Sequence, residues 1–195
     1  AIYRISAQES SERANITIPT PSFFIPQAGY CSPVDITKAF ISTSTTRVTA
    51  RCSLEAVALE PIGSQWRVTF NSGETATSDV VVLCGAHEIS KFLQTSWIPL
   101  EPIRGQTVQA IASQESRPLK TVISYDGYIT PADDGIHFVG AHYRHNDANE
   151  LPNDQDTTEI LSRLYRTLPT ISGVDTLNSR VCFRASTHDR MPYIG

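Results

Sequence analysis

Hydrophobic and polar positions alternate in short runs along much of the chain, and turn residues separate the runs. Gln65–Phe70 and Glu74–Ser78 alternate on either side of Asn71-Ser72-Gly73, which predicts a β-hairpin. A second group of short runs predicts an antiparallel meander in which Gly135 occupies a turn position with positive φ. The strands expected in this meander are Ile103–Ile111, Leu119–Ser124, Tyr128–Thr130 and Ile136–Gly140. Further strands are expected at Phe23–Ile25, Arg47–Cys52, Leu54–Leu59 and Val174–Thr187.

Two segments carry helical signals instead. Ser32 followed by Pro33 is typical of a helix start, because the serine caps free N–H groups and proline loses nothing at the first position. That helix should end near Ser44. A second helix should be capped near Asn153 and end at Pro169. Its apolar positions recur at helical spacing, at Ile160, Leu161, Leu164 and Leu168. A short helix is also expected around Glu88–Leu93.

One run departs from alternation. Val80–Leu83 is apolar at every position, which is typical of a parallel strand buried on both faces. A dinucleotide-binding half would begin with a strand and a G-x-G-x-x-G turn, and no such glycine cluster occurs in the sequence. The pattern therefore predicts an α+β fold: an antiparallel sheet with flanking helices beside an incomplete nucleotide-binding layer.

Composition narrows the class of protein. The 195 residues are 40% hydrophobic and 18% charged, which excludes a disordered tail or a coiled coil. The longest apolar run, Val80–Cys84, is too short to cross a bilayer, so no membrane partner is expected. The formal net charge of −4 gives no overall attraction to nucleic acid. Four scattered cysteines and no signal-like opening favour a reduced, cytoplasmic protein, and no metal site is expected, His142-x-x-His145 included.

Several stretches, in order, resemble the flavin-dependent amine oxidases of the D-amino-acid oxidase and glycine oxidase superfamily. They are FFIPQAGYCSPVDITKAFI, VVVLCGAHEI, PIRGQT, GYITP with GIHFVGA, and FRASTHDRMPYIG. The YDGYITP and RASTHDRMPYIG stretches look more narrowly like the oxidase half of the bifunctional tRNA 5-methylaminomethyl-2-thiouridine biosynthesis family. The resemblance runs from Phe23 to Gly195. In that family the flavin domain begins earlier and continues later, so this chain looks like the middle of a longer protein.

The resemblance implies a function for the longer protein. It would use FAD to remove the carboxymethyl group of 5-carboxymethylaminomethyl-2-thiouridine at the tRNA wobble position, with a methyltransferase domain on the same chain. This piece alone is expected to be inactive, and its binding of FAD is doubtful because the glycine loop that holds the pyrophosphate is missing. Two alternatives stay open: an amino-acid oxidase of the glycine or sarcosine type, and a non-catalytic module that binds RNA or a partner.

The resemblance also implies which residues meet the substrate. Arg184 stands where glycine-type oxidases hold the substrate carboxylate, and a guanidinium fork suits that group. Tyr128 stands where a tyrosine borders the same pocket. Tyr125 lies three residues away and should point to the opposite face, so at most one of the two tyrosines lines the pocket. No residue of this chain is expected to act as a nucleophile or a general base.

Cofactor contacts are implied at the adenine edge and beside the flavin ring. The adenine edge would meet the backbone of Val57. Near the ring the family stretch places glycine directly before the histidine, whereas this chain has Gly85 followed by Ala86 and His87. The remaining candidates are Arg104, Gly105 and Gln106, for which a tight structural crossing between domains is the favoured interpretation, and Pro192 and Gly195 in the last turn.

The same resemblance implies a division of the chain. Residues 1–25 would lead into a substrate domain, 26–98 would be a remnant of a glutathione-reductase-type FAD-binding domain, 99–178 the substrate domain, and 179–195 a strand returning toward the flavin. The flavin-facing surface left exposed in such a piece could drive dimerisation. No tRNA-binding surface is evident, because the basic side chains are scattered among acidic ones.

Overall fold

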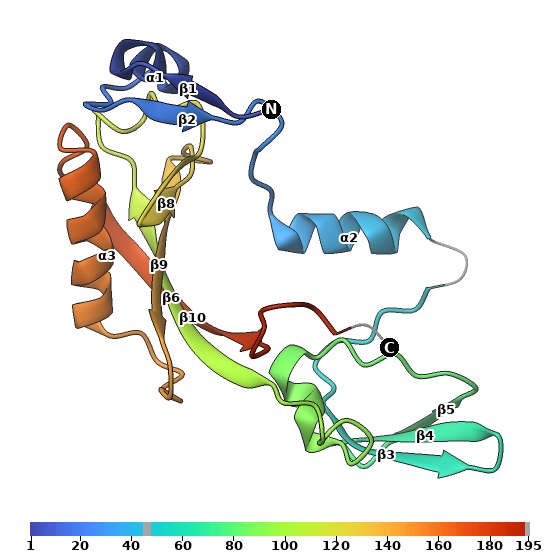
Figure 1. The fold of residues 1–195 in the computed structure, drawn as a ribbon. Coiled ribbons are helices and arrows are strands. Elements are labelled where there is room, and N and C mark those ends of the chain that lie inside the picture. The colour runs from blue at the N-terminus through green and yellow to red at the C-terminus, as the bar shows by residue number, and fades with distance from the viewer. Residues whose placement is uncertain (45–47, 194–195) are drawn as a thin grey trace. The chain divides into compact units, whose positions relative to one another are not determined.

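The computed structural model describes residues 1–44 and 48–193 and divides into two units. The first unit comprises residues 1–31 and 103–183, and the second comprises 32–102 and 184–195. Strands β6 (Glu101–Ile111) and β10 (Asp175–Ser186) each run from one unit into the other. Figure 1 shows the order of the elements in each unit.

The first unit is built on a five-stranded sheet with the order β10-β6-β9-β8-β7. Its remaining strands are β7 (Ile123–Tyr125), β8 (Gly127–Ile129) and β9 (Ile136–Arg144). Strands β7, β8 and β9 form an antiparallel meander, as predicted. The prediction is wrong for β6: as the first strand of a meander it should lie beside β7, but it pairs with the free edge of β9. The β8–β9 connection ends in a tight turn in which Asp134 and Gly135 both have positive φ, 47° and 77°.

Helix α3 (Asp154–Thr167) covers one face of this sheet (Figure 1). Asn153 caps it as predicted, since its side-chain oxygen accepts a hydrogen bond from the N–H of Asp156 at 2.7 Å. The apolar side of the helix meets the sheet in the main hydrophobic core, where the fully buried members are Val108, Ala110, Ile129, Val139, Leu164, Leu168 and Ile171. The periodicity seen in the sequence therefore places this core correctly.

The N-terminal residues close the end of the same core. Strands β1 (Tyr3–Ile5) and β2 (Ser22–Phe24) form a two-stranded sheet, with α1 (Ala7–Ala14) between them in sequence. Ala14, Ile16 and Ile18 pack into the core. Helix α1 was not predicted, because its eight residues carry only a weak apolar stripe.

The second unit contains α2 (Pro33–Thr43), the three-stranded sheet β3 (Ala56–Ile62), β4 (Gln65–Phe70) and β5 (Thr75–Ser78), and the 3₁₀ helix η1 (Ala86–Lys91). Ser32 caps α2 as predicted, accepting a hydrogen bond from the N–H of Asp35. The predicted hairpin also forms, with Gly73 at a φ of 82°.

Two strand predictions fail in this unit. Arg47 lies outside the described residues, and residues 48–52 contain no strand. Residues 80–83 form no strand either, and Val80 and Val82 are 73% and 77% exposed. A buried parallel strand needs a neighbour to pair with and layers on both faces. Among the described residues the only sheet of this unit is antiparallel, and it does not pair with residues 80–83.

Candidate functional site

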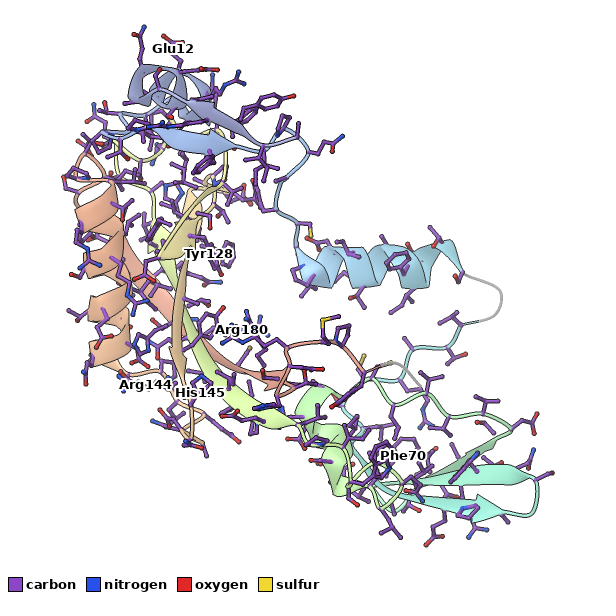
Figure 2. The ribbon with its side chains drawn as sticks, viewed as in Figure 1. Glu12, Phe70, Tyr128, Arg144, His145 and Arg180 are labelled. Atoms are coloured by element: carbon purple, nitrogen blue, oxygen red, sulfur yellow. The ribbon has the colours of Figure 1, made fainter. Side chains whose placement is uncertain are left out.

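The five-stranded sheet has a helix face, which α3 covers, and an opposite face that we call the open face. Along β6, Arg104, Gln106 and Val108 are buried toward α3, whereas the intervening Gly105 and Thr107 belong to the open face. Across the sheet, the open face also carries Tyr128 of β8 and Phe138 and Tyr143 of β9. Figure 2 labels Tyr128 on β8. The open face is where the predicted substrate-facing tyrosine lies.

Tyr128 rests directly on a glycine of the neighbouring strand. Tyr128 and Gly140 are paired across β8 and β9, and a Cβ at Gly140 would lie 2.8 Å from three atoms of the Tyr128 side chain. Gly127, one residue earlier, is equally constrained, since a Cβ there would lie 2.6 Å from the carbonyl oxygen of Gly140. Gly140 therefore leaves room for the Tyr128 ring against the sheet, whereas Gly127 allows the close approach of the β9 backbone and the Tyr125 ring.

A β-bulge decides which side chains of β9 reach the open face. The register jumps from Thr107 opposite Gly140 to Gln106 opposite His142, so Ala141 is the extra residue. Before the bulge, Val139 points into the core; after it, His142 turns toward α3. Tyr143 is therefore on the open face, next to Gly105, where a Cβ would lie 3.1 Å from the Tyr143 ring.

Tyr125 lies on the other face from Tyr128, as predicted. It packs against the hydrophobic core, and its hydroxyl is buried without a hydrogen bond among the described residues. Burial raises the pKa of Tyr125, because the phenolate would lose its solvation. Tyr125 is thus a core residue that carries an unsatisfied polar group.

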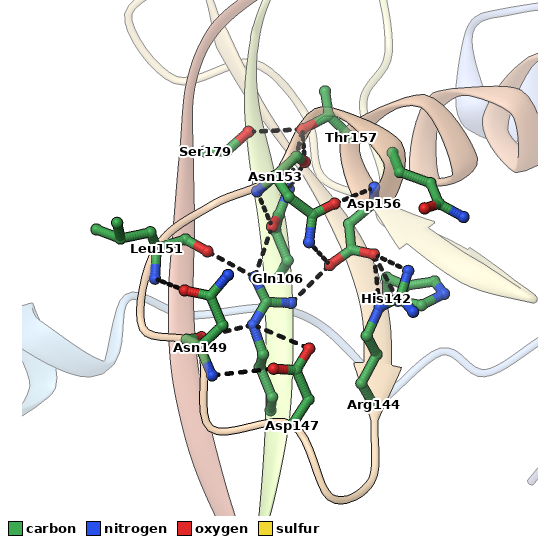
Figure 3. A network of polar contacts seen from close by, with 12 residues as sticks. Gln106, His142, Arg144, Asp147, Asn149, Leu151, Asn153, Asp156, Thr157 and Ser179 are labelled. Atoms are coloured by element: carbon green, nitrogen blue, oxygen red, sulfur yellow. Dashed lines mark hydrogen bonds and ion pairs between the residues drawn. The ribbon is translucent and has the colours of Figure 1, made fainter.

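The helix face holds a buried polar network centred on Arg104 (Figure 3). The Arg104 side chain is fully buried. It donates hydrogen bonds to Asp156 Oδ2 at 2.6 Å, to Gln106 Oε1 at 3.1 Å, and to the carbonyl oxygens of Asn149 and Leu151 at 2.7 and 2.8 Å. Four of its N–H groups are therefore used: two hold the loop that precedes α3, one binds α3 itself and one binds Gln106 on the same strand.

Gln106 extends this network along β6. Its amide nitrogen donates to the carbonyl of Asn153 and to the Thr157 hydroxyl, each at 2.9 Å, and its amide oxygen accepts from the N–H of Asn153 at 3.0 Å. Thr157 in turn contacts Ser179 of β10 at 3.1 Å. These contacts support the structural interpretation of the Arg-Gly-Gln stretch. The side chains of Arg104 and Gln106 both bind α3 and the loop before it.

Asp156 is the carboxylate that balances the buried arginine. It is fully buried and also accepts hydrogen bonds from Arg144, at 2.6 and 2.8 Å, and from Asn153 at 2.8 Å. Burial alone would raise the pKa of Asp156, but the hydrogen bonds from Arg144, Arg104 and Asn153 outweigh it and hold that pKa below its usual value. The carboxylate is therefore ionised and structural.

His142 joins the same network and is not arranged as a metal ligand. Its Nδ1 lies 3.3 Å from Asp156 and its Nε2 lies 2.7 Å from Glu159. Within residues 1–44 and 48–193, no group of three or more potential metal-binding side chains gathers.

The remaining substrate-side candidates lie near the end of β10. Alternation along the strand makes Arg180, Cys182 and Arg184 exposed, whereas Val181 and Phe183 are half-buried. Beyond the strand, Asp189 accepts a hydrogen bond from the N–H of Met191 at 3.0 Å, which ties the predicted turn together. Pro192 is exposed next to this turn, and Gly195 lies outside the described residues.

The cofactor candidates of the second unit lie on β3 and before η1. Val57 is 47% exposed, and the register between β3 and β4 shifts at this residue, from Ala56 opposite Phe70 to Ala58 opposite Thr69. The extra residue of such a bulge is left out of the ladder, so its backbone groups remain available to a ligand. This geometry suits the backbone contact predicted for Val57.

A cavity of about 590 Å³ lies beside Gly85. The Lys91–Glu55 ion pair, at 2.7 Å, and Phe92 belong to its wall. The rest of the lining is Leu54, Ala56, Val82, Leu83, Cys84, Gly85, Glu88 and Ile89. Ala86 has a φ of 53°, a conformation that favours glycine, and it stands where the resembling family places glycine.

Comparison with known proteins defines the class. The FAD dependent oxidoreductase family matches residues 2–195, and the chain belongs to that family. The chain is 30% identical over 192 residues to the tRNA 5-methylaminomethyl-2-thiouridine biosynthesis bifunctional protein MnmC of Chromobacterium violaceum, covering 95% of this chain and 29% of that protein. The MnmC protein of Stutzerimonas stutzeri is 29% identical over 202 residues, covering 100% and 30%. The chain thus spans about 30% of the length of these curated relatives.

Solved structures confirm the fold. Glycine oxidase from Geobacillus kaustophilus superposes with a TM-score of 0.85 at 18% identity, covering all of this chain and 54% of that one. L-proline dehydrogenase from P. horikoshii gives 0.83 at 18% identity, covering 100% and 55%. The predicted α+β architecture and the predicted resemblance are both confirmed. In the described residues no helix is long and apolar enough to cross a membrane.

One residue of the open face was missed by sequence reasoning. Tyr143 lies in the FVGAHYRHND stretch, and its orientation depends on the bulge at Ala141. Simple alternation from the buried Val139 would have directed Tyr143 into the core. The available signal was Gly140-Ala141, two small residues inside a strand, which often mark a bulge.

Proposed function

We propose that the protein containing this chain is an FAD-dependent oxidase that removes the carboxymethyl group from 5-carboxymethylaminomethyl-2-thiouridine in tRNA. The observation that carries this proposal is the similarity over 95% or more of the chain to bifunctional proteins named for 5-methylaminomethyl-2-thiouridine biosynthesis in tRNA. The family membership supports the oxidoreductase chemistry.

The described residues fit part of an FAD. The bulge at Val57 leaves backbone groups free to bind a planar edge such as that of adenine. Leu54 and Ala56, close to Val57 in the sequence, contribute to the apolar lining of the cavity beside Gly85. The side chains of Arg104 and Gln106 do not take part, since both are buried in the helix-face network. The sequence contains no G-x-G-x-x-G turn, so these 195 residues supply no such cradle for the pyrophosphate.

The proposed substrate is an N-substituted glycine attached to a uracil ring. Arg184 would pair with its carboxylate through two parallel N–H groups, and the Tyr128 hydroxyl would donate a further hydrogen bond. Held in this way, the α-carbon between carboxylate and amine is fixed in position, and the amine must be neutral to lose a hydride equivalent. Bound FAD would accept that hydride. Water then adds to the resulting C=N bond, giving a primary amine on the uridine and glyoxylate.

The role of Arg184 can be tested in the full-length protein with Arg184→Met. Loss of a charge-assisted pair is expected to lower kcat/KM for the modified tRNA by about 30-fold or more, corresponding to roughly 2–5 kcal/mol. Arg166→Met is the matched control, because Arg166 is an exposed arginine in the last turn of α3. Wild-type kcat/KM in Arg184→Met, measured by release of glyoxylate, would show that Arg184 does not hold the carboxylate.

A further inference from the structure

Two tyrosine rings lie on the open face, each over a glycine of a neighbouring strand. Tyr128 of β8 covers Gly140, and Tyr143 of β9 covers Gly105 of β6. Any side chain at either glycine would lift the ring above it, since the nearest contacts of a Cβ would be 2.8 and 3.1 Å. The sheet is therefore built to hold both rings flat, and they form an aromatic floor that we define as Tyr128 and Tyr143.

This floor is accessible in the chain. Tyr143 is 45% exposed, and Phe138, on the same face of β9, is 42% exposed. Polar side chains of β6 lie alongside, with Thr107 opposite Gly140 and Gln109 opposite Phe138 in the register. Exposed aromatic rings next to hydroxyl and amide groups match the needs of a nucleobase, which presents flat faces for stacking and an edge of donors and acceptors.

We propose that Tyr143 is the residue on which the pyrimidine base of the substrate nucleotide stacks. The proposal rests on the proposed function, in which Tyr128 helps to hold the carboxylate end of the substrate. It adds a binding site for the base itself, and it makes Tyr143 a specificity-determining residue that separates a nucleotide-linked amine from a free amino acid.

The spacing of the two rings agrees with the shape of that substrate. The arm from the uracil ring to the carboxylate carbon spans four bonds and extends roughly 5 Å, from bond lengths of about 1.5 Å. Gly140, under Tyr128, and Tyr143 are three positions apart on a bulged strand, which is less than about 10 Å at roughly 3.3 Å per residue. A carboxylate at Tyr128 therefore leaves the base within reach of Tyr143.

The test uses the full-length holoenzyme and two substrates, modified tRNA and N-methylglycine, which lacks a base. Tyr143→Leu is expected to lower kcat/KM for the tRNA about 5- to 150-fold, the range of base–aromatic stacking. It should leave kcat/KM for N-methylglycine within about twofold. Tyr143→Phe keeps the ring and should behave as wild type on both substrates. Tyr3→Ala is the matched control, since Tyr3 is a 53% exposed tyrosine on β1.

A binding measurement separates this inference from the proposed function. 2-Thiouridine carries the base without the amine arm, so it cannot be oxidised but should inhibit oxidation of N-methylglycine competitively. Its inhibition constant should rise at least fivefold in Tyr143→Leu and stay unchanged in Tyr143→Phe and Tyr3→Ala. If wild type oxidises N-methylglycine but not the tRNA, the proposed function fails, and 2-thiouridine inhibition still decides the stacking role. Equal losses on tRNA and N-methylglycine, loss in Tyr143→Phe, or no inhibition by 2-thiouridine would each overturn the role of Tyr143.

Discussion

Replacing Asp156 should destabilise the first unit more than any surface change. Asp156 and Arg104 are both fully buried, and their side chains meet at 2.6 Å. Without the carboxylate, Arg104 remains as a buried cation whose partners among the described residues are Gln106, two backbone carbonyls and the Asp147 carboxylate 3.8 Å away. Removing one partner of a buried ion pair costs about 3–5 kcal/mol. We expect a loss of this size in Asp156→Ala.

Two comparisons refine that magnitude. Asp156→Asn keeps the shape and some hydrogen bonds, so its cost should be lower than that of alanine but still above about 1.5 kcal/mol, the value typical of losing a hydrogen bond to a charged group. Arg144 also binds Asp156, but its side chain is 33% exposed and can be hydrated when unpaired. Arg144→Ala should therefore cost less than Asp156→Ala, about 1–2 kcal/mol.

Hydrogen exchange followed by mass spectrometry measures this effect in the full-length protein, because it follows the opening of α3 and β6 separately from other domains. A cost of 3–5 kcal/mol corresponds to exchange that is faster by about 150- to 5,000-fold in peptides of residues 103–111 and 154–167. Asp154→Asn is the control, since Asp154 is an exposed acid in the first turn of the same helix. Less than tenfold faster exchange in Asp156→Ala, or an equal change in Asp154→Asn, would refute the network's role.

Three further predictions concern single residues. Ala86→Gly should stabilise the second unit by about 1 kcal/mol, since Ala86 has a φ of 53°, which glycine adopts without strain. Ala76→Gly, in the extended strand β5, should destabilise the unit instead. Hydrogen exchange of the η1 and β5 peptides measures both effects. Tyr125→Phe should slow the opening of β7 and β8, because it removes a buried hydroxyl that has no hydrogen-bond partner in the part of the chain that the structure describes. Faster opening would contradict this. Burial lowers the pKa of His137, despite a hydrogen bond to the carbonyl of Thr130, so the unfolded chain binds the proton more tightly than the folded chain. Stability should be complete above the unfolded pKa of about 6.5 and fall below it, and His137→Gln should remove that part of the pH dependence of thermal unfolding.

The helix starts and the tight turns were predictable from the sequence, because the residues that define them are close together in the chain. Ser32 and Asn153 cap helices because their side chains satisfy free N–H groups at short range, and Gly73 and Gly135 adopt the positive φ that their turns require. These features depend on residues close in sequence. They hold in the structure for that reason.

Features that depend on distant partners were not predictable in the same way. Val80–Leu83 has the composition of a buried strand, but a strand also needs neighbours, and the described residues supply none for it. From the sequence, Arg104 fits either a structural crossing between domains or a cofactor contact. Its burial depends on the Asp156 carboxylate, which lies 52 positions later in the sequence. The bulge at Ala141 reverses the orientation of Tyr143, and single-sequence alternation gives no direct sign of it.

The most direct measurement of the central claim is anaerobic reduction of the flavin in the full-length protein. Purified holoenzyme is mixed without oxygen with tRNA carrying 5-carboxymethylaminomethyl-2-thiouridine, and the visible absorbance of oxidised flavin is followed together with the glyoxylate formed. The account predicts that the absorbance bleaches with one glyoxylate and one primary amine on the tRNA per flavin reduced. Bleaching by glycine or N-methylglycine without any bleaching by the modified tRNA would contradict it and would favour a free amino-acid oxidase.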